Sequence, residues 1–213
     1  MGSVELIKDG VIGEYYALRG DGAKNAFKNP MASCRKVILN SNDIVVDIGA
    51  FVGEYSMIAS RVAKKVISYE ASPDVFKVLS MNKKPNMTIH NKAVIGGNEK
   101  SIELFLSKGI GATNSIVKST SKRGSVVVPA INYIQAVKGA TVVKIDVEGA
   151  EYEYDIIQPY LRAIILEFHP IANIDWQKKA NKVMSDLKKA GFKPLMIPGF
   201  KNGWDTNSAW VKK

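Results

Sequence analysis

The chain alternates short apolar segments with amphipathic ones, and this alternation limits the folds that it can adopt. The amphipathic segments have apolar residues at helical spacing and cover residues 54–64, a stretch opened by Ser72-Pro73, and residues 175–190. Runs rich in Val and Ile lie between and around them, which predicts buried strands at 43–48, 65–70, 87–90, 141–146 and 162–168. Strands that alternate with helices predict an α/β fold in which helices cover both faces of a parallel sheet.

Two further pairs of segments do not fit the simple alternation. Residues 101–107 and 125–129 are expected to be strands on either side of a polar loop, and residues 193–198 and 208–212 a C-terminal hairpin. No repeat or linker divides the sequence. We therefore expect an N-terminal leader, residues 1–40, that packs on a single domain formed by residues 41–213.

Charge and cysteine content restrict the classes of function. The 30 Lys and Arg residues exceed the 20 Asp and Glu residues and give a net charge of +10, which suits an anionic partner such as nucleic acid. The lysines are nevertheless spread along the chain, and aromatic residues do not interleave with them as stacking platforms would. Cys34 is the only cysteine, which excludes an intrachain disulfide and a cysteine metal cluster.

The sequence contains no apolar run near the length of about 20 residues that crosses a membrane. Its first residues also lack the charged-then-apolar pattern of a secretion signal. We therefore expect no membrane span and a cytoplasmic location.

The first predicted strand ends in a turn that is typical of nucleotide-type cofactor sites. The sequence IVVDIGAFVG places Asp47 at the strand end, and Gly49 and Gly53 around a turn into a helix whose first backbone groups favour polar ligands. The next strand ends at Glu70, where a carboxylate can accept both hydroxyls of a ribose. This arrangement predicts a cofactor that contains a nucleoside.

Several cofactors are disfavoured by missing motifs. The sequence has no G-x-x-x-x-G-K-[ST] loop for a nucleoside triphosphate and no Tyr followed by Lys four positions later, as short-chain nicotinamide enzymes require. The turn D-x-G-x-x-x-G lacks the central glycine that brings the backbone closest to a pyrophosphate. S-adenosylmethionine has no pyrophosphate, and Asp47 suits its cationic methionine end. We therefore expect this cofactor.

A second acidic region follows the fourth predicted strand. Asp146 ends that strand, beside the first strand in this topology, and the fifth strand ends with Glu167 and His169. Ligands of open α/β sheets bind outside the carboxyl ends of the strands. Because side chains alternate, Lys144, Asp146 and Glu148 start on one face. A helix is expected to follow, and Glu151 in its first turn can serve either as a cap or in catalysis. We expect Lys144 to pair with Glu167, which leaves Asp146 and His169 facing the ligand crevice.

The motifs of the chain together resemble those of the FkbM-type S-adenosylmethionine-dependent methyltransferases. The resemblance covers about residues 40 to 170 and rests on IVVDIGAFVG, ISYEASP, HNKAV, VVKIDVEGAEYE and IILEFHP, of which KIDVEGAE is the most specific. It implies a class I methyltransferase fold, Rossmann-like, with a mostly parallel seven-stranded sheet and an antiparallel last strand. It also implies methyl transfer to an oxygen of a small molecule, often a sugar or polyketide hydroxyl.

The resemblance also implies roles for individual residues. Asp47, Gly49 and Gly53 match the methionine-side loop, and Glu70 matches the ribose acid. The acidic signature of the family falls on Asp146, Glu148 and Glu151. Phe51 departs from the pattern, because many members carry Asn there. The full set expected around the cofactor is Asp47, Gly49, Ala50, Phe51, Gly53, Tyr55, Glu70, Ala71, Asn91, Ala93 and Asp146, and the set expected around the acceptor is Asn114, Glu148 and His169.

The chemistry expected at this site is activation of an acceptor hydroxyl, with His169, Asp146 and Glu167 as catalytic residues. An alcohol oxygen is a poor nucleophile until its proton is removed or a metal polarises it. Three devices stay open: His169 as a general base, Mg²⁺ held by Asp146 with Glu148 or Glu167, and positioning alone.

The sequence thus favours an O-methyltransferase that acts on a hydroxyl of a carbohydrate or a similar small acceptor. The net charge of +10 keeps a nucleic-acid methyltransferase, for example at a ribose hydroxyl, as an alternative. A third hypothesis is a non-catalytic protein that keeps the fold and binds the cofactor.

Overall fold

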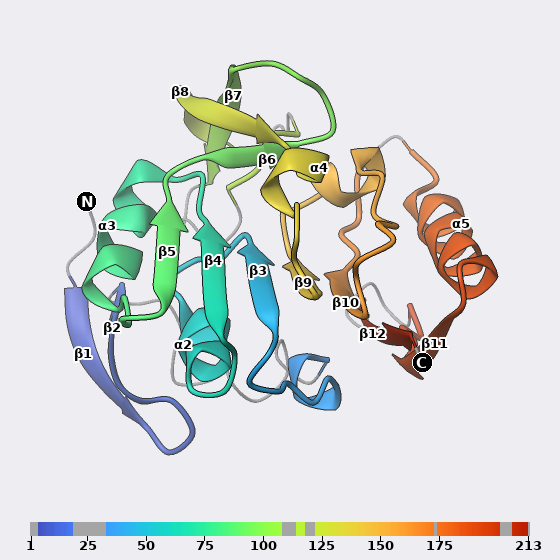
Figure 1. Cartoon of the computed structure of the whole chain (residues 1–213). Helices are drawn as coiled ribbons and strands as arrows, with labels where there is room; N and C mark the ends of the chain where they lie inside the picture. The colour runs from blue at the N-terminus through green and yellow to red at the C-terminus, as the bar shows by residue number, and fades with distance from the viewer. Residues whose placement is uncertain are drawn as a thin grey trace.

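A mostly parallel sheet forms the centre of the computed structural model, which describes residues 4–18, 33–107, 114–117, 122–172, 174–200 and 206–212 (Figure 1). The strand order of this seven-stranded sheet is β11-β12-β10-β9-β3-β4-β5. Its strands are β3 (Ile44–Ile48), β4 (Lys65–Tyr69), β5 (Met87–His90), β9 (Val142–Ile145), β10 (Ala163–Glu167), β11 (Phe192–Met196) and β12 (Asn207–Lys212).

The directions of the strands match the expected class I methyltransferase fold. β3, β4, β5, β9 and β10 are parallel to their neighbours in this group, whereas β12, the last strand, is antiparallel to both β10 and β11. The predicted C-terminal hairpin is therefore β11 with β12. Chain order reverses between β3 and β9, which makes that point the topological switch of the sheet.

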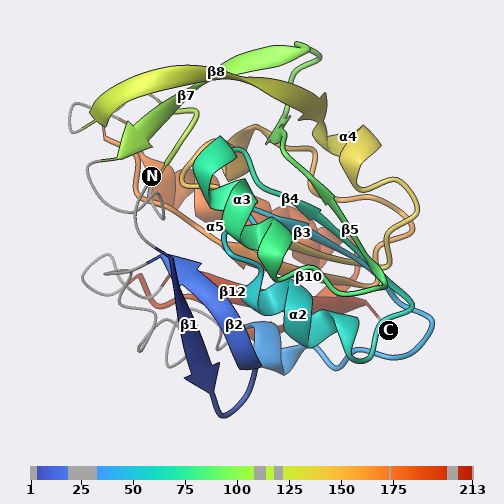
Figure 2. The same ribbon diagram turned by 90° about the vertical axis from the view of Figure 1, so that its left-hand side faces the viewer.

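Helices cover both faces of the sheet, as the alternation of the sequence predicts (Figures 1 and 2). Successive strand residues face opposite sides, so Val45 belongs to one hydrophobic core and Val46 to the other. The first core is closed by α2 (Glu54–Ser60) and α3 (Pro73–Met81), and the second by α4 (Tyr133–Ala136), the 3₁₀ helix η2 (Ala150–Glu153) and α5 (Trp176–Lys189).

The N-terminal residues contribute a hairpin to the first core. Strands β1 (Val4–Asp9) and β2 (Gly13–Leu18) are antiparallel, and β2 lies against α3. Tyr15 is buried there and donates a hydrogen bond from its hydroxyl to Glu54 Oε1 at 3.0 Å. A short 3₁₀ helix, η1 (Cys34–Lys36), precedes the main sheet. The described part of the leader thus forms a β-hairpin and a short 3₁₀ helix, and both contribute residues to the first core.

A second, smaller sheet stands beyond the carboxyl ends of the parallel strands (Figures 1 and 2). It consists of β6 (Ala93–Ile95), β7 (Ser101–Ser107) and β8 (Lys122–Asn132) in the order β6-β8-β7. β8 extends well beyond the predicted strand at 125–129. Most of the predicted polar loop, residues 108–113 and 118–121, lies outside the described residues. Its described part, residues 114–117, pairs with β7 through a bridge between Ser115 and Phe105.

Two expectations about helices need correction. The helix predicted to run to residue 64 ends at Ser60, because residues 61–64 form turns. The helix expected after the acid-rich segment is only η2, four residues long. Among the described residues, no helix is both long enough and apolar enough to cross a bilayer.

Candidate functional site

Two loops meet where the order of the strands reverses. One follows β3 and includes Gly49 to Gly53, and the other follows β9 and includes Asp146 to Gly149 (Figure 1). Ligands of open α/β sheets bind in the crevice at this point, outside the carboxyl ends of the strands. The predicted cofactor turn after β3 and the predicted acidic region after β9 therefore lie side by side.

Gly49 permits the close approach of the two loops. Its φ is 76°, in the left-handed region, and a Cβ atom added there would lie 1.7 Å from the backbone oxygen of Asp146. Directly before it, the Asp146 N–H donates to Ile48 O at 3.0 Å and continues the ladder between β3 and β9. A side chain at position 49 would therefore force the two loops apart.

Each loop also holds one non-glycine residue in the left-handed conformation. Phe51 has a φ of 52° and Glu148 a φ of 56°. Such backbone is costly for residues other than Gly, Asn and Asp, and it concentrates at functional sites. Asn adopts this conformation more readily than Phe does, so Phe51 holds the turn at a greater conformational cost.

Glu70 lies directly after β4 and faces the glycine turn. Its carboxylate is buried and accepts backbone N–H groups from Phe51 at 2.9 Å and Ser72 at 2.8 Å. Burial raises the pKa of Glu70 to about 7, although the two hydrogen bonds act in the opposite direction. Asn91 holds this corner together, because its Nδ2 donates to the backbone oxygens of Glu70 at 2.8 Å and Ala71 at 3.0 Å.

Other residues of the predicted cofactor set lie farther into the protein. Ala50 and Tyr55 are buried in the first hydrophobic core, and Ala93 is buried in the core of the smaller sheet. Asp47 is fully buried at the end of β3, where its Oδ2 accepts a hydrogen bond from Ser56 Oγ at 2.6 Å. The structure thus brings Phe51, Glu70, Ala71 and Asn91 together around the turn, and places Ala50, Tyr55 and Ala93 in packing positions.

Lys144 corrects an expectation from the sequence, because it does not pair with Glu167. Its Nζ lies 3.4 Å from Asp47 Oδ1 and 3.2 Å from Asp146 Oδ2, and it donates to Gly49 O at 3.2 Å. The strand register explains this partner, since Asp47 and Lys144 face each other across β3 and β9. Burial opposes its charge, but Asp146 and Asp47 raise the pKa of Lys144 above its usual value.

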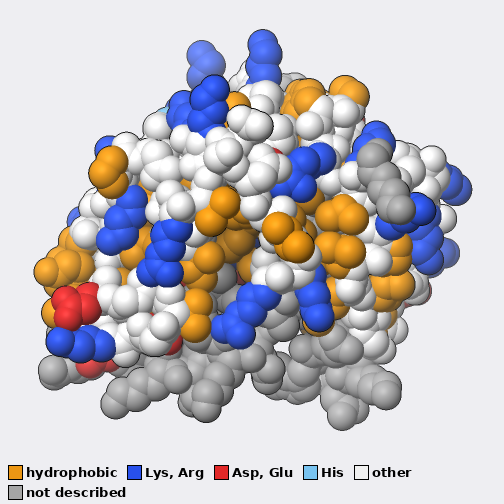
Figure 3. Space-filling model, turned by 60° about the horizontal axis from the view of Figure 1, so that its bottom comes forward, with side chains coloured by type: hydrophobic (Ala, Val, Ile, Leu, Met, Phe, Trp, Pro, Cys, Tyr) orange, Lys and Arg blue, Asp and Glu red, His pale blue; other side chains and the backbone are white. Residues whose placement is uncertain are grey.

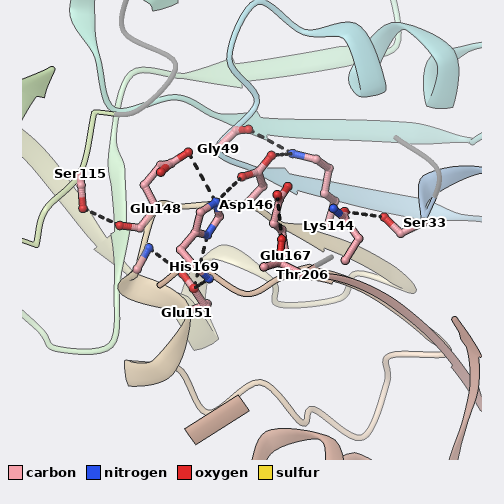
Figure 4. Close-up of polar contacts among 12 residues, drawn as sticks. Ser33, Gly49, Ser115, Lys144, Asp146, Glu148, Glu151, Glu167, His169 and Thr206 are labelled. Carbon is pink, nitrogen blue, oxygen red and sulfur yellow. Dashed lines mark hydrogen bonds and ion pairs between the residues drawn. The ribbon is translucent and has the colours of Figure 1, made fainter. Parts of the chain in front are cut away.

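His169 is surrounded by three carboxylates (Figure 4). Its Nε2 lies 3.6 Å from Asp146 Oδ1 and 3.4 Å from Glu148 Oε1, and its Nδ1 lies 3.4 Å from Glu151 Oε1. Burial opposes a charged ring, but Glu148 and Glu151 raise the pKa of His169 well above its usual value. These carboxylates therefore favour the protonated form of the imidazole, which disfavours His169 as a general base as long as they surround it.

Glu151 is a site residue whose position the sequence leaves open between helix capping and catalysis. It is fully buried, and its two oxygens accept the backbone N–H groups of Gly149 at 2.8 Å and His169 at 2.6 Å. Tyr152 adds a second constraint, because its hydroxyl donates to His169 O at 2.9 Å. Two residues of η2 therefore fix His169, which lies two residues after the end of β10. The only signal for this role is the acidic motif itself.

Glu167 lies at the end of β10, two residues before His169. Burial raises its pKa to about 7, and Asp146 contributes in the same direction. Its Oε1 accepts a hydrogen bond from Thr206 Oγ1 at 3.3 Å. Glu167 is therefore part of the same acidic crevice, but its hydrogen-bond partner is Thr206, the residue directly before β12.

The segment 114–117 approaches the crevice from the smaller sheet. Asn114 is used internally, since its Oδ1 accepts the backbone N–H of Ser107 at 2.8 Å. Ser115 instead contacts the site, and its Oγ donates to Glu148 O at 2.6 Å (Figure 4). Ser115, and not the expected acceptor residue Asn114, thus supports the left-handed turn at Glu148.

Among the described residues, one group has the composition and spacing of a metal site. One ligand atom each from Asp146, Glu148 and His169 lie within 4.8 Å of one another. The sequence predicts oxygen ligands for Mg²⁺ here, from Asp146 with Glu148 or Glu167. The structure assembles two carboxylates with an imidazole, which is a different donor set.

Comparison with solved structures places the fold in a known class. A methyltransferase FkbM from Methylobacillus flagellatus matches with a TM-score of 0.53 and 13% identity, over 82% of this chain and 44% of that one. A Pyrococcus horikoshii protein classed provisionally as a transferase matches with a TM-score of 0.50 and 14% identity, over 99% and 71%. A tRNA (m1A58) methyltransferase from Aquifex aeolicus matches with a TM-score of 0.46 and 13% identity, over 86% and 66%.

The likeness to the FkbM protein, together with the strand order and the antiparallel last strand, establishes a class I, Rossmann-like methyltransferase fold. The chain spans less than half the length of the FkbM protein that it matches. No family model matches the chain, and no curated protein matches it in sequence. Membership of the FkbM family therefore stays a prediction from the motifs.

Proposed function

We propose that the protein is an S-adenosylmethionine-dependent methyltransferase that methylates a hydroxyl oxygen of a carbohydrate or a similar small acceptor. The observation that carries the proposal is the placement of acids on both sides of the glycine turn after β3. Glu70 lies on the β4 side and Asp146 on the β9 side. This is the crevice in which α/β folds of this class bind a nucleoside cofactor.

The cofactor role of Glu70 is compatible with its hydrogen bonds. An ionised carboxylate has about four lone-pair sites, so two remain for ribose hydroxyls after the Phe51 and Ser72 N–H groups are bound. Asn91 and Ala71 border the same corner and are proposed to flank the adenosine. The cationic methionine end is proposed to lie toward Asp47 and Asp146, where the local charge is negative.

The acceptor is proposed to lie on the other side of Asp146. His169 and Glu167 come from the end of β10 and face the same crevice, and Glu148 approaches from the β9 loop (Figure 4). Methyl transfer from a sulfonium is an in-line displacement, so these groups contribute by orienting the hydroxyl toward the methyl group. Their carboxylate oxygens can also accept the hydroxyl proton.

The charge of the surface is the observation that keeps a nucleic-acid acceptor as the alternative. The net charge is +10, yet Lys and Arg side chains are scattered over the face seen in Figure 3, with hydrophobic and uncharged groups between them. A phosphate backbone would be bound best by a continuous basic stripe. The crevice itself is lined by carboxylates, which favours an acceptor without phosphates.

Calorimetric titration with S-adenosylmethionine tests the cofactor. Wild-type protein should bind it, and Glu70→Ala should weaken binding by about tenfold or more, since a buried acceptor of two hydroxyls is lost. Glu153→Ala removes an exposed acid close to the crevice and is the matched control, with unchanged affinity expected. Absence of binding to wild-type protein would refute the proposal.

Transfer of labelled methyl groups tests the acceptor. The protein is incubated with labelled cofactor and separate panels of glycans, small polyols and RNA, and the products are identified by mass spectrometry. Label in glycans or polyols supports the proposal. Label in RNA alone, with binding that weakens steeply as salt is raised, would establish the alternative instead.

A further inference from the structure

The distances between the His169 ring and its carboxylates are longer than those of good charge-assisted hydrogen bonds. Charge-assisted N–H···O bonds are about 2.7–2.9 Å long. The ring nitrogens of His169 lie 3.4–3.6 Å from the nearest carboxylate oxygens, and Nδ1 is buried without a hydrogen-bond partner. Ion pairs between His169 and the carboxylates therefore explain only part of why these side chains lie together.

The same distances fit ligands that share one metal ion. With bonds of about 2.1 Å, two ligand atoms lie about 3.0 Å apart at a right angle and about 3.4 Å apart at the tetrahedral angle. The distances from Nε2 to Asp146 Oδ1 and to Glu148 Oε1 are 3.6 Å and 3.4 Å. All three ligand atoms lie within 4.8 Å of one another, so side-chain rotations that bring Asp146 and Glu148 closer together would place all three on one ion.

Glu151 gives a second and independent reason. Metal-binding histidines usually have a carboxylate or carbonyl behind the other ring nitrogen, which fixes the ring and its tautomer. Glu151 Oε1 lies 3.4 Å from Nδ1, on the side of the ring away from Asp146 and Glu148 (Figure 4). Glu151 is itself fully buried and held by the N–H groups of Gly149 and His169. A solvated acidic surface would not need this support.

The backbone around Glu148 indicates that its side chain has a function. Glu148 occupies the left-handed region with a φ of 56°, where glycine would be free of strain. Gly149 follows at a φ of 111°, and Ser115 holds the Glu148 carbonyl. A carboxylate is therefore kept at a position where the backbone alone favours glycine.

From these observations we propose that Asp146, Glu148 and His169 bind a first-row divalent metal ion such as Mn²⁺, Co²⁺ or Zn²⁺, with Glu151 as the positioning residue behind His169. One imidazole with two carboxylates suits these ions better than Mg²⁺, which prefers oxygen ligands and retains its water. Three protein ligands leave positions open toward the crevice. Two neighbouring oxygens of an acceptor, such as a vicinal diol, can fill them. This last inference on the acceptor rests on the proposed function, whereas the metal site itself does not.

Calorimetry with each metal ion alone, on tag-free protein, tests the site. We expect one equivalent of Co²⁺ or Zn²⁺ to bind at least about tenfold more tightly than Mg²⁺. His169→Gln and Glu148→Gln should each weaken binding by about tenfold or more, and Glu151→Gln by about 10- to 100-fold as a loss of support behind the ligand. Absence of binding by wild-type protein would overturn the proposal.

Two substitutions serve as matched controls. His90→Gln removes the other histidine, which stacks on Tyr69, and Glu153→Gln removes an exposed acid beside the site. Both should bind metal within about twofold of wild type, because neither residue is among the ligands. Equal losses in a ligand variant and its control would overturn the assignment. The absorption spectrum of bound Co²⁺ should change in Glu151→Gln, and an unchanged spectrum and affinity would remove its positioning role.

S-adenosylmethionine binding is measured on the same samples without metal. Cofactor binding together with no metal binding would refute the metal site and leave the proposed function standing. Metal binding together with no cofactor binding would refute the proposed function and leave the metal site. Thermal unfolding of each variant identifies any that fail to fold. In that case Glu148→Asp replaces Glu148→Gln, and Glu151→Asp replaces Glu151→Gln.

Discussion

Gly49 offers a direct test of how the two loops of the site are held together. Alanine at this position faces two separate penalties. The left-handed backbone, with a φ of 76°, costs about 1–2 kcal/mol for a residue with a Cβ atom. In addition, the new Cβ atom would lie 1.7 Å from the Asp146 carbonyl oxygen, so the loops after β3 and β9 must separate.

Separation of the loops breaks the hydrogen bond from Asp146 N to Ile48 O, which is 3.0 Å long. Loss of a buried backbone pair costs about 1–3 kcal/mol. The two penalties together predict that Gly49→Ala lowers the free energy of unfolding by about 2–5 kcal/mol, or that the variant does not fold.

Gly139→Ala is the matched control. Gly139 has nearly the same backbone, with a φ of 78°, but its added Cβ atom would meet nothing within 4 Å. It should therefore lose only the conformational part, about 1–2 kcal/mol. Urea denaturation followed by circular dichroism measures both variants. Equal losses at the two positions would refute the argument that Gly49 is required by the close approach of Asp146.

Three further outcomes are expected. Lys144→Met should lower the free energy of unfolding by about 3–5 kcal/mol because it leaves Asp47 buried without a cation, and Asp47→Asn in the same chain should recover most of that loss. Urea denaturation of the single and double variants at pH 8 measures both effects. A Lys144→Met variant within about 1 kcal/mol of wild type would contradict the prediction. The pKa of Glu70 is raised from 4.5 to about 7 in the folded protein, so its contribution to stability is full below pH 4.5 and is lost as the pH rises through about 7. Between pH 5 and pH 8, wild type should therefore lose up to about 3 kcal/mol of stability relative to Glu70→Gln. A stability difference that does not change with pH would exclude the raised pKa. Glu148→Gly should leave the free energy of unfolding unchanged or raise it by up to about 1 kcal/mol, and it should weaken metal binding at least about tenfold. A clear loss of stability in thermal unfolding would show that the turn at Glu148 is not strained.

The fold could be predicted from the sequence because its central strands are buried on both faces. The run from Val142 to Ile145, for example, is apolar at every position except Lys144. The glycine turn after β3 was located in the same way, since Gly49 and Gly53 both have the left-handed backbone that the motif requires. Local chemistry determines these elements, so local patterns suffice to find them.

The partners of individual side chains depend on strand register, which the sequence does not specify. Lys144 faces Asp47 on one neighbouring strand and Ile165 on the other, so Glu167 lies two residues farther along and out of its pairing position. The support of His169 by Glu151 was also beyond prediction. It depends on a four-residue 3₁₀ helix in place of a longer α-helix, and on backbone N–H groups that any residue could supply.

The position of β9 beside β3 has a consequence for how the protein folds. Ile44 N, at the start of β3, bonds Thr141 Oγ1 across 97 residues of sequence, whereas β3, β4 and β5 follow one another closely in the chain. Contacts between distant segments form slowly because a long loop must close first. The half of the sheet around the glycine turn can therefore assemble early, and the seam with β9 closes late. The proposed cofactor site combines Glu70 and Asp146 from the two sides of this seam, so the cofactor should slow unfolding more than it speeds refolding.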